Sequence, residues 1–222
     1  MVNRETKPKN WPSSLPYLKV PRYSKNLTPE QLQLVRQQPR AGTVHVIPAN
    51  EPRGPTSVAK ITPIVNPSHP ANGQAGLLAA RDLKPGQLIV QYIGELHSSC
   101  SAEDVAEHSQ SDYDLWIDRD AGVAVDASRA GCEARFVNDF RGVADRPNAE
   151  FREVWDAARK ERGIAVFVLP ERKGTKARSG PQTKSGIKKG SEILVSYGKG
   201  FWGGRNGGQT DAGDCNEQQT SS

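Results

Sequence analysis

One ten-residue stretch, residues 131–140 with the sequence GCEARFVNDF, constrains the fold more than any other part of the chain. It follows a run of small and apolar residues at 122–127 that predicts a strand. A core strand alternates or is continuously apolar, whereas this stretch mixes Arg, Asn and Asp with small and aromatic residues before a turn at Arg141-Gly142. Residue types alone favour a polar turn with Phe136 and Val137 in the core, so a functional reading depends on the surrounding motifs.

The 222 residues suit one domain of ordinary size with extensions. Hydrophobic residues make up 35%, with 21 Gly and 16 Pro, so we expect a compact centre with loose ends. We expect an irregular N-terminal arm over residues 1–57, a folded domain over 58–202 and a disordered tail over 203–222. Within the arm, Thr28-Pro29-Glu30-Gln31 has a capping-box pattern and predicts a short helix near residues 28–38.

Short strands separated by turn residues dominate the remaining pattern. They are predicted at 58–65, 76–80, 88–96, 113–118, 122–127, 164–169 and 191–197, with one short acidic helix at 101–110. The fold class is therefore mainly β with few short helices. The sequence contains neither a dinucleotide-binding nor a Walker glycine pattern, and no repeat of fixed period.

Charge is unevenly distributed along a chain whose formal net charge is +5. Residues 101–120 hold seven acids against one base, and residues 170–189 hold seven bases against one acid. Each run by itself is most often a solvated face, but together they would suit a basic peptide on one side and a nucleic-acid contact through residues 170–189 on another.

The cysteine pattern and the hydropathy of the sequence indicate which cellular compartment suits the protein. Cys100, Cys132 and Cys215 lack metal-ligand spacing, so we expect neither a disulfide framework nor a metal site, and a reducing compartment fits best. The polar, Pro-rich N-terminus has no apolar signal region, and no run approaches the length of a membrane span. We expect a protein that is not secreted and has no membrane partner.

Six ordered motifs between Val58 and Trp202 resemble the SET-domain protein lysine methyltransferases. They are the glycine loop and small-residue strand at 73–79, Tyr92-Ile93-Gly94-Glu95, the tyrosine strand at 113–118, Asp126-Ala127 followed by Ala134-Arg135-Phe136-Val137-Asn138, Pro147-Asn148, and the segment KGSEILVSYG at 189–198. Any one of these motifs alone would be weak evidence for the resemblance, but six motifs in the family's order are specific.

The resemblance implies small curved β-sheets and a pseudoknot in which the segments through Asn138 and Tyr197 pack together. It implies S-adenosylmethionine as cofactor in one cleft and a peptide in another, joined by a channel for the target lysine. By position in the motifs, the cofactor-binding residues would be Gly76, Leu77, Arg135, Phe136, Asn138 and Asp139. The catalytic residues would be Tyr197 and Tyr113, and the substrate channel would include Tyr92, Trp116 and Trp202.

Several positions depart from the family pattern. Asp139 stands where the family usually has His, Gln74 replaces the first glycine of a Gly-x-Gly, and Val195 replaces a Tyr or Phe. The zinc-binding cysteine segments of many members are absent from this sequence, and residues 170–186 form a basic insertion.

Three hypotheses follow. The first is a lysine methyltransferase that acts on a histone or another basic protein, in the nucleus or otherwise in the cytoplasm. The second is a SET-like module that has lost catalysis and binds peptide or chromatin. The third is a non-enzymatic nucleic-acid-binding protein.

Overall fold

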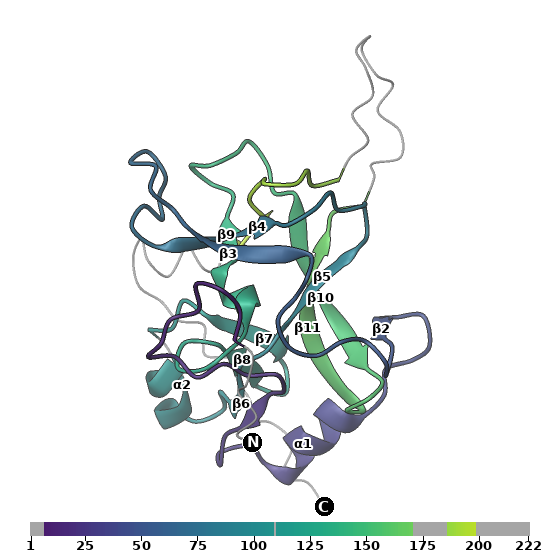
Figure 1. Ribbon diagram of the computed structural model, residues 1–222. Coiled ribbons are helices and arrows are strands. Elements are labelled where there is room, and N and C mark those ends of the chain that lie inside the picture. The colour runs from purple at the N-terminus through teal and green to yellow at the C-terminus, as the bar shows by residue number, and fades with distance from the viewer. Residues whose placement is uncertain (1–6, 109, 171–185, 199–222) are drawn as a thin grey trace, which may run out of the picture.

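A computed structural model describes residues 7–108, 110–170 and 186–198. Two four-stranded sheets and two short strand pairs make up the fold (Figure 1), which confirms the mainly β prediction. The first sheet has the order β1-β6-β8-β7, with bounds Arg22–Tyr23, Glu95–Ser98, Val123–Asp126 and Asp114–Asp118. The second has the order β2-β10-β11-β5, with bounds His45–Ile47, Ala149–Asp156, Glu161–Val168 and Leu88–Tyr92.

Each of the two strand pairs includes residues of the sequence motifs described above. Strand β3 (Ala59–Pro63) pairs with β4 (Ala75–Ala79) antiparallel, and β9 (Asn138–Asp139) pairs with β12 (Leu194–Val195) parallel. A 3-10 helix, η1 (Glu133–Phe136), immediately precedes β9. The central ten-residue stretch is therefore a helical turn followed by a very short strand.

Both predicted helices are present. Helix α1 (Pro29–Arg36) has Thr28 as its N-cap residue. The Thr28 side chain accepts from the Gln31 backbone N–H, and the Gln31 side chain accepts from Thr28 N–H. This capping box is the one that the sequence predicts. Helix α2 (Ala102–His108) has Glu103 and Asp104 in its first turn, where negative charge favours a helix.

The single strand predicted at 88–96 is wrong, because the structure divides it into β5 and β6, which belong to different sheets. The division falls at Gly94. A Cβ atom there would lie 2.3 Å from the backbone oxygen of Asp126, so only glycine permits this close approach of two backbones. The break lets the chain leave one sheet at Tyr92 and enter the other at Glu95.

Strand β10 was not predicted, and β11 begins earlier than the predicted strand at 164–169. Charged residues in β10 obscure its pattern in the sequence. In the structure these charges are paired: Arg152 contacts Glu150 on the same strand, and Arg162 of β11 lies 2.6 Å from Glu153 across the hairpin. Cross-strand pairing of opposite charges stabilises a sheet without any apolar alternation.

The strand predicted at 191–197 is also shorter than expected, since only β12 is regular. Backbone groups of this segment bond to three different segments instead of one neighbour: Ile193 N–H donates to the Leu77 carbonyl, Asn148 N–H donates to the Leu194 carbonyl, and Phe140 N–H donates to the Val195 carbonyl. The Asn148 side chain adds bonds to Leu194 N–H and to the Glu192 carbonyl. These contacts confirm that the segments through Asn138 and Tyr197 pack together.

The N-terminal arm takes part in the core, whereas the sequence suggested that folding begins at residue 58. Strand β1 pairs with β6, and β2 pairs with β10. Trp11, Tyr17 and Val35 are buried in the same hydrophobic cluster as Leu77 and Ile193. In Figure 1 the arm crosses in front of η1 and β8 before it reaches α1 below β11.

Some expectations lie outside the described residues. These are the channel residue Trp202, the part of the basic insertion at 171–185, the tail at 203–222 and Cys215. Among the helices that the structure describes, none has the length and apolar character needed to cross a bilayer.

Candidate functional site

Three tyrosines from distant parts of the chain meet at the end of β5. Tyr92 donates its hydroxyl to the carbonyl oxygen of Tyr113 at 2.7 Å. Tyr197 donates its hydroxyl to the carbonyl oxygen of Val137, also at 2.7 Å, directly before β9. Tyr92 is buried, while Tyr113 and Tyr197 are half-buried. The pseudoknot thus brings a residue of the C-terminal segment into contact with the central stretch.

The hydroxyls influence one another electrostatically. Burial raises the pKa of Tyr197 above its usual value, and the negative charge of Asp139 raises it further. Burial also raises the pKa of Tyr92, with a contribution from Tyr197. All of these effects disfavour the phenolate, so Tyr92 and Tyr197 remain neutral hydroxyl groups at physiological pH.

Helix η1 places a cation and an aromatic ring beside the tyrosines. The Arg135 Nε–H donates to the Ala127 carbonyl at 2.9 Å, which fixes the guanidinium 4.2 Å from the ring centre of Tyr113 and 5.2 Å from that of Phe136. On the other side, Phe136 meets the ring of Trp11 edge-on at 5.7 Å. Arg135 and Phe136 are both half-buried, so parts of each remain accessible.

Asn138 links the two motif segments that flank the tyrosines. Its side-chain N–H group donates to Glu192 at 2.8 Å and, more weakly, to the Ala75 carbonyl at 3.4 Å. Glu192 reaches Asn138 because Gly76 has no side chain: a Cβ there would lie 2.6 Å from the Glu192 Oε1. His69 contacts the second oxygen of Glu192 at 3.0 Å.

Asp139 occupies the position that departs from the family pattern, and its carboxylate has a definite structural role. One oxygen accepts from the backbone N–H of Tyr197 at 2.7 Å, and the other accepts from the backbone N–H of Arg141 at 2.9 Å. The Arg141 guanidinium also pairs with it at 2.8 Å. Asp139 therefore holds the backbone of Tyr197 against β9.

Gly76, Arg135, Phe136, Asn138 and Asp139 thus lie on the segments around Tyr92, Tyr113 and Tyr197, whereas the side chains of two predicted site residues, Leu77 and Trp116, point elsewhere. Leu77 is fully buried in the core, and its carbonyl accepts from Ile193. Trp116 is 41% exposed and carries the Arg119 guanidinium over its ring. Because side chains alternate along β7, Trp116 points away from the face that Leu115 and Ile117 pack against the core.

Sequence reasoning gave no role to several residues that shape this site. Glu192 stands within a quoted motif, and its place beside Asn138 could have been suspected from the pseudoknot. His69 and Trp11 had no signal at all, since both come from Pro-rich segments with no periodic pattern. Only the folded chain brings them to the site.

The sheets, the pseudoknot and the tyrosine cluster define a SET-type architecture. The family model of the SET domain matches residues 74–198, which is more than half of the chain, and the chain therefore belongs to the SET-domain family.

One curated relative is the histone-lysine N-methyltransferase ASHH1 of Arabidopsis thaliana, which is 32% identical over 133 residues. The match covers 58% of this chain and 23% of the relative, so the chain spans about a quarter of that protein.

Solved structures of polycomb repressive complex 2 also match. One, an autoinhibited form bound to S-adenosylmethionine, is 21% identical with a TM-score of 0.46 and covers 64% of this chain and 15% of the matched chain. Another, from Chaetomium thermophilum, is 24% identical with a TM-score of 0.41 and covers 56% and 14%. The family assignment rests on the family model.

Proposed function

We propose that the chain is an S-adenosylmethionine-dependent protein-lysine N-methyltransferase that acts on a histone or another basic protein. The observation that carries this proposal is the convergence of Tyr92, Tyr113 and Tyr197, with the Tyr197 hydroxyl fixed on the Val137 carbonyl. A hydroxyl that donates to a carbonyl directs its oxygen lone pairs elsewhere. Those lone pairs can accept from an amine or orient a positively polarised methyl group.

The residues at the site fit the proposed cofactor chemically. S-adenosylmethionine supplies a methyl group on a sulfonium, which needs positioning and dry surroundings more than a nucleophilic side chain. The nearby thiol, Cys132, is buried and donates to the Gln91 carbonyl, and burial raises its pKa to about 12. It therefore stays a neutral thiol that cannot compete for the methyl group. Gly76 allows the Glu192 carboxylate to approach and hold Asn138, because a Cβ at this position would lie 2.6 Å from the Glu192 Oε1.

The roles of the individual residues follow from their places. The Gly76 backbone, Arg135, Phe136, Asn138 and Asp139 would hold the cofactor. Tyr113 and Tyr197 would line the lysine channel beside Tyr92. A free lysine has a pKa near ~10.4, and only its neutral amine can attack, so aromatic rings that exclude water favour the reactive form.

A basic substrate is supported by the acidic segment that carries Tyr113. Asp112 is exposed directly before Tyr113, and Asp120 is exposed after the far end of β7. Acidic groups beside a channel attract lysine- and arginine-rich peptides. The relative ASHH1 is by its name a histone-lysine methyltransferase, and a histone substrate with a nuclear location forms part of the proposal.

The test is transfer of a labelled methyl group to mixed core histones by the wild type and by Tyr197→Phe. The variant keeps the ring and its packing but loses one hydroxyl. We expect the variant to bind cofactor with little change by calorimetry and to lose on the order of 10²-fold in rate. Thermal melting would establish that both proteins are folded.

Each outcome is informative. Equal activity of the two proteins would refute the role of Tyr197. Cofactor binding without any transfer would favour a catalytically inactive module that binds peptide or chromatin. Absence of binding at millimolar cofactor would exclude the enzyme.

A further inference from the structure

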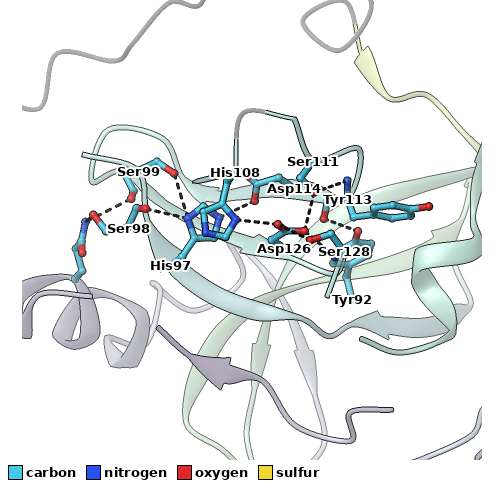
Figure 2. A network of polar contacts seen from close by, with 12 residues as sticks. Tyr92, His97, Ser98, Ser99, His108, Ser111, Tyr113, Asp114, Asp126 and Ser128 are labelled. Atoms are coloured by element: carbon cyan, nitrogen blue, oxygen red, sulfur yellow. Dashed lines mark hydrogen bonds and ion pairs between the residues drawn. The ribbon is translucent and has the colours of Figure 1, made fainter. Parts of the chain in front are cut away.

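Two histidines lie stacked under the segment that leads to Tyr113, and each faces a carboxylate (Figure 2). The rings of His97 on β6 and His108 on α2 are 3.5 Å apart and nearly parallel. His97 contacts Asp114 of β7 at 2.8 Å, and His108 contacts Asp126 of β8 at 2.8 Å. We call these four residues, with Ser111 and Ser128, the histidine–aspartate network.

The hydrogen-bond partners of His97 favour its protonated, positively charged form. Its Nδ1 lies 2.9 Å from the Ser98 carbonyl and its Nε2 lies 2.8 Å from the Asp114 carboxylate. Both of these oxygens are acceptors, so the imidazolium form of His97 can donate to both, while the Ser99 hydroxyl lies 3.4 Å from Nδ1. Burial opposes this charge, but the hydrogen bond and charge of Asp114 outweigh it and raise the pKa of His97.

The ring of His108 stacks on that of His97 and donates its Nδ1–H to the Asp126 carboxylate at 2.8 Å. Among the described residues, Asp114 and Asp126 are the carboxylates in contact with the pair, and α2 contributes His108 itself.

Asp126 connects this pair to Tyr113. It accepts from the Ser111 hydroxyl at 2.8 Å, and the Ser111 oxygen accepts from the backbone N–H of Tyr113 at 3.1 Å. Ser128 also donates to Asp126, through its backbone and its hydroxyl. On its other side, the Tyr113 carbonyl accepts from Tyr92 and from Ala127 N–H. In Figure 2 the ring of Tyr113 points away from the histidines.

We propose that the histidine–aspartate network positions Tyr113, with Asp126 and Ser111 as the positioning residues that fix its backbone and the stacked His97 and His108 as the support that ties α2 to the sheet. The network would act on kcat through the orientation of the Tyr113 ring, a consequence that rests on the proposed function. The positioning itself can be measured without substrate.

The network also gives Tyr113 a dependence on pH. Because the pKa of folded His97 is raised above about 6.5, its charge stabilises the network fully below that pH. As pH rises through the raised pKa, His97 loses its positive charge, and the charge attraction between its ring and the Asp114 carboxylate disappears. The support is then weakened, and the segment at 110–114 loosens on the alkaline side.

The first experiment compares Ser111→Ala with Ser111→Thr. The alanine variant removes the hydroxyl between Asp126 and Tyr113, and the threonine variant keeps it. We expect Ser111→Ala to increase the hydrogen-exchange rate of the Tyr113 amide at least tenfold and to lower kcat about tenfold with little change in KM, and Ser111→Thr to restore both. An unchanged Tyr113 amide in Ser111→Ala would overturn the proposal.

The second experiment follows the imidazole nitrogens and the Tyr113 amide by ¹⁵N NMR during a pH titration. We expect the Tyr113 resonance to change with the midpoint of His97, and this midpoint to move to lower pH in Asp114→Asn but not in the control His45→Gln, whose exposed residue lies in the other sheet. A Tyr113 resonance that does not follow His97 would refute the coupling. If the wild type transfers no methyl group, the proposed function fails, while these NMR outcomes still decide the network.

Discussion

Asp139 has, in this chain, a task that depends on having two carboxylate oxygens. One oxygen accepts from Tyr197 N–H and the other accepts from Arg141 N–H, and the side chain is only 7% exposed. A buried donor that loses its acceptor costs about 1–3 kcal/mol. The departure from the family histidine is therefore compatible with an ordered site, because the aspartate stabilises the backbone of the residue proposed as catalytic.

Asp139→Ala should lower the free energy of unfolding by about 2 kcal/mol, since it leaves both backbone donors without this acceptor. Asp139→Asn retains one acceptor oxygen and should cost about half as much. Denaturant unfolding measures both values. The matched control is Asp145→Ala, because Asp145 is exposed in the same loop. A loss in Asp145→Ala equal to that in Asp139→Ala would contradict the assignment.

At the scale of elements, the N-terminal arm and η1 behave as one unit. Tyr17 pairs with Gly131 in a parallel bridge, and Leu18 N–H donates to the Gly131 carbonyl. The Tyr17 hydroxyl donates to Glu133 at 3.0 Å, and Thr56 N–H donates to its other oxygen at 2.8 Å. Glu133 is 1% exposed, so these partners offset the cost of burying it.

Tyr17→Phe should destabilise the protein by about 2 kcal/mol, because a hydrogen bond to a buried acidic group is lost. A double-mutant cycle with Glu133→Gln should give a coupling of about 1 kcal/mol or more between the two side chains. Thermal and denaturant unfolding provide the four stabilities. Simple additivity of the two substitutions would show that the arm and η1 are not linked through this contact.

At the scale of the whole molecule, charge placement matters more than the formal net charge of +5. Asp114 pairs with His97, Asp118 pairs with Arg162, and Asp104 accepts a hydrogen bond from Asn26. The acidic segment is therefore partly structural. Lys188 likewise pairs with Asp82 at 3.0 Å. The exposed acids that lie near Tyr113 are the ones expected to attract a basic peptide.

Asp112→Asn should raise KM for a lysine-rich peptide about two- to threefold at low salt and have little effect at high salt, because exposed charges are screened. Asp120→Asn makes the same change of charge beyond the far end of β7 and should have a smaller effect. Steady-state kinetics at two ionic strengths tests both. Equal effects of the two substitutions would mean that the segment acts only through its total charge.

Local signals predicted much of this fold. The capping box at Thr28 and the turn residues bounding the strands act over a few neighbouring residues, and those elements are confirmed. Strand β10 and the split at Gly94 were not predicted. The first depends on charges paired across a hairpin, and the second on a backbone from another sheet that passes within contact distance.

For the candidate site too, some features could be predicted from the sequence and others could not. The order of its motifs is written in the sequence, so Tyr92, Tyr113, Arg135, Asn138 and Tyr197 could be named in advance. The contacts that fix these residues join positions far apart in the chain, such as Trp11 with Phe136 and His69 with Glu192. Sequence determined which groups this protein has and where its local elements begin and end. Tertiary structure alone decided their partners, since burial and distance between remote segments set each hydrogen bond and each charge.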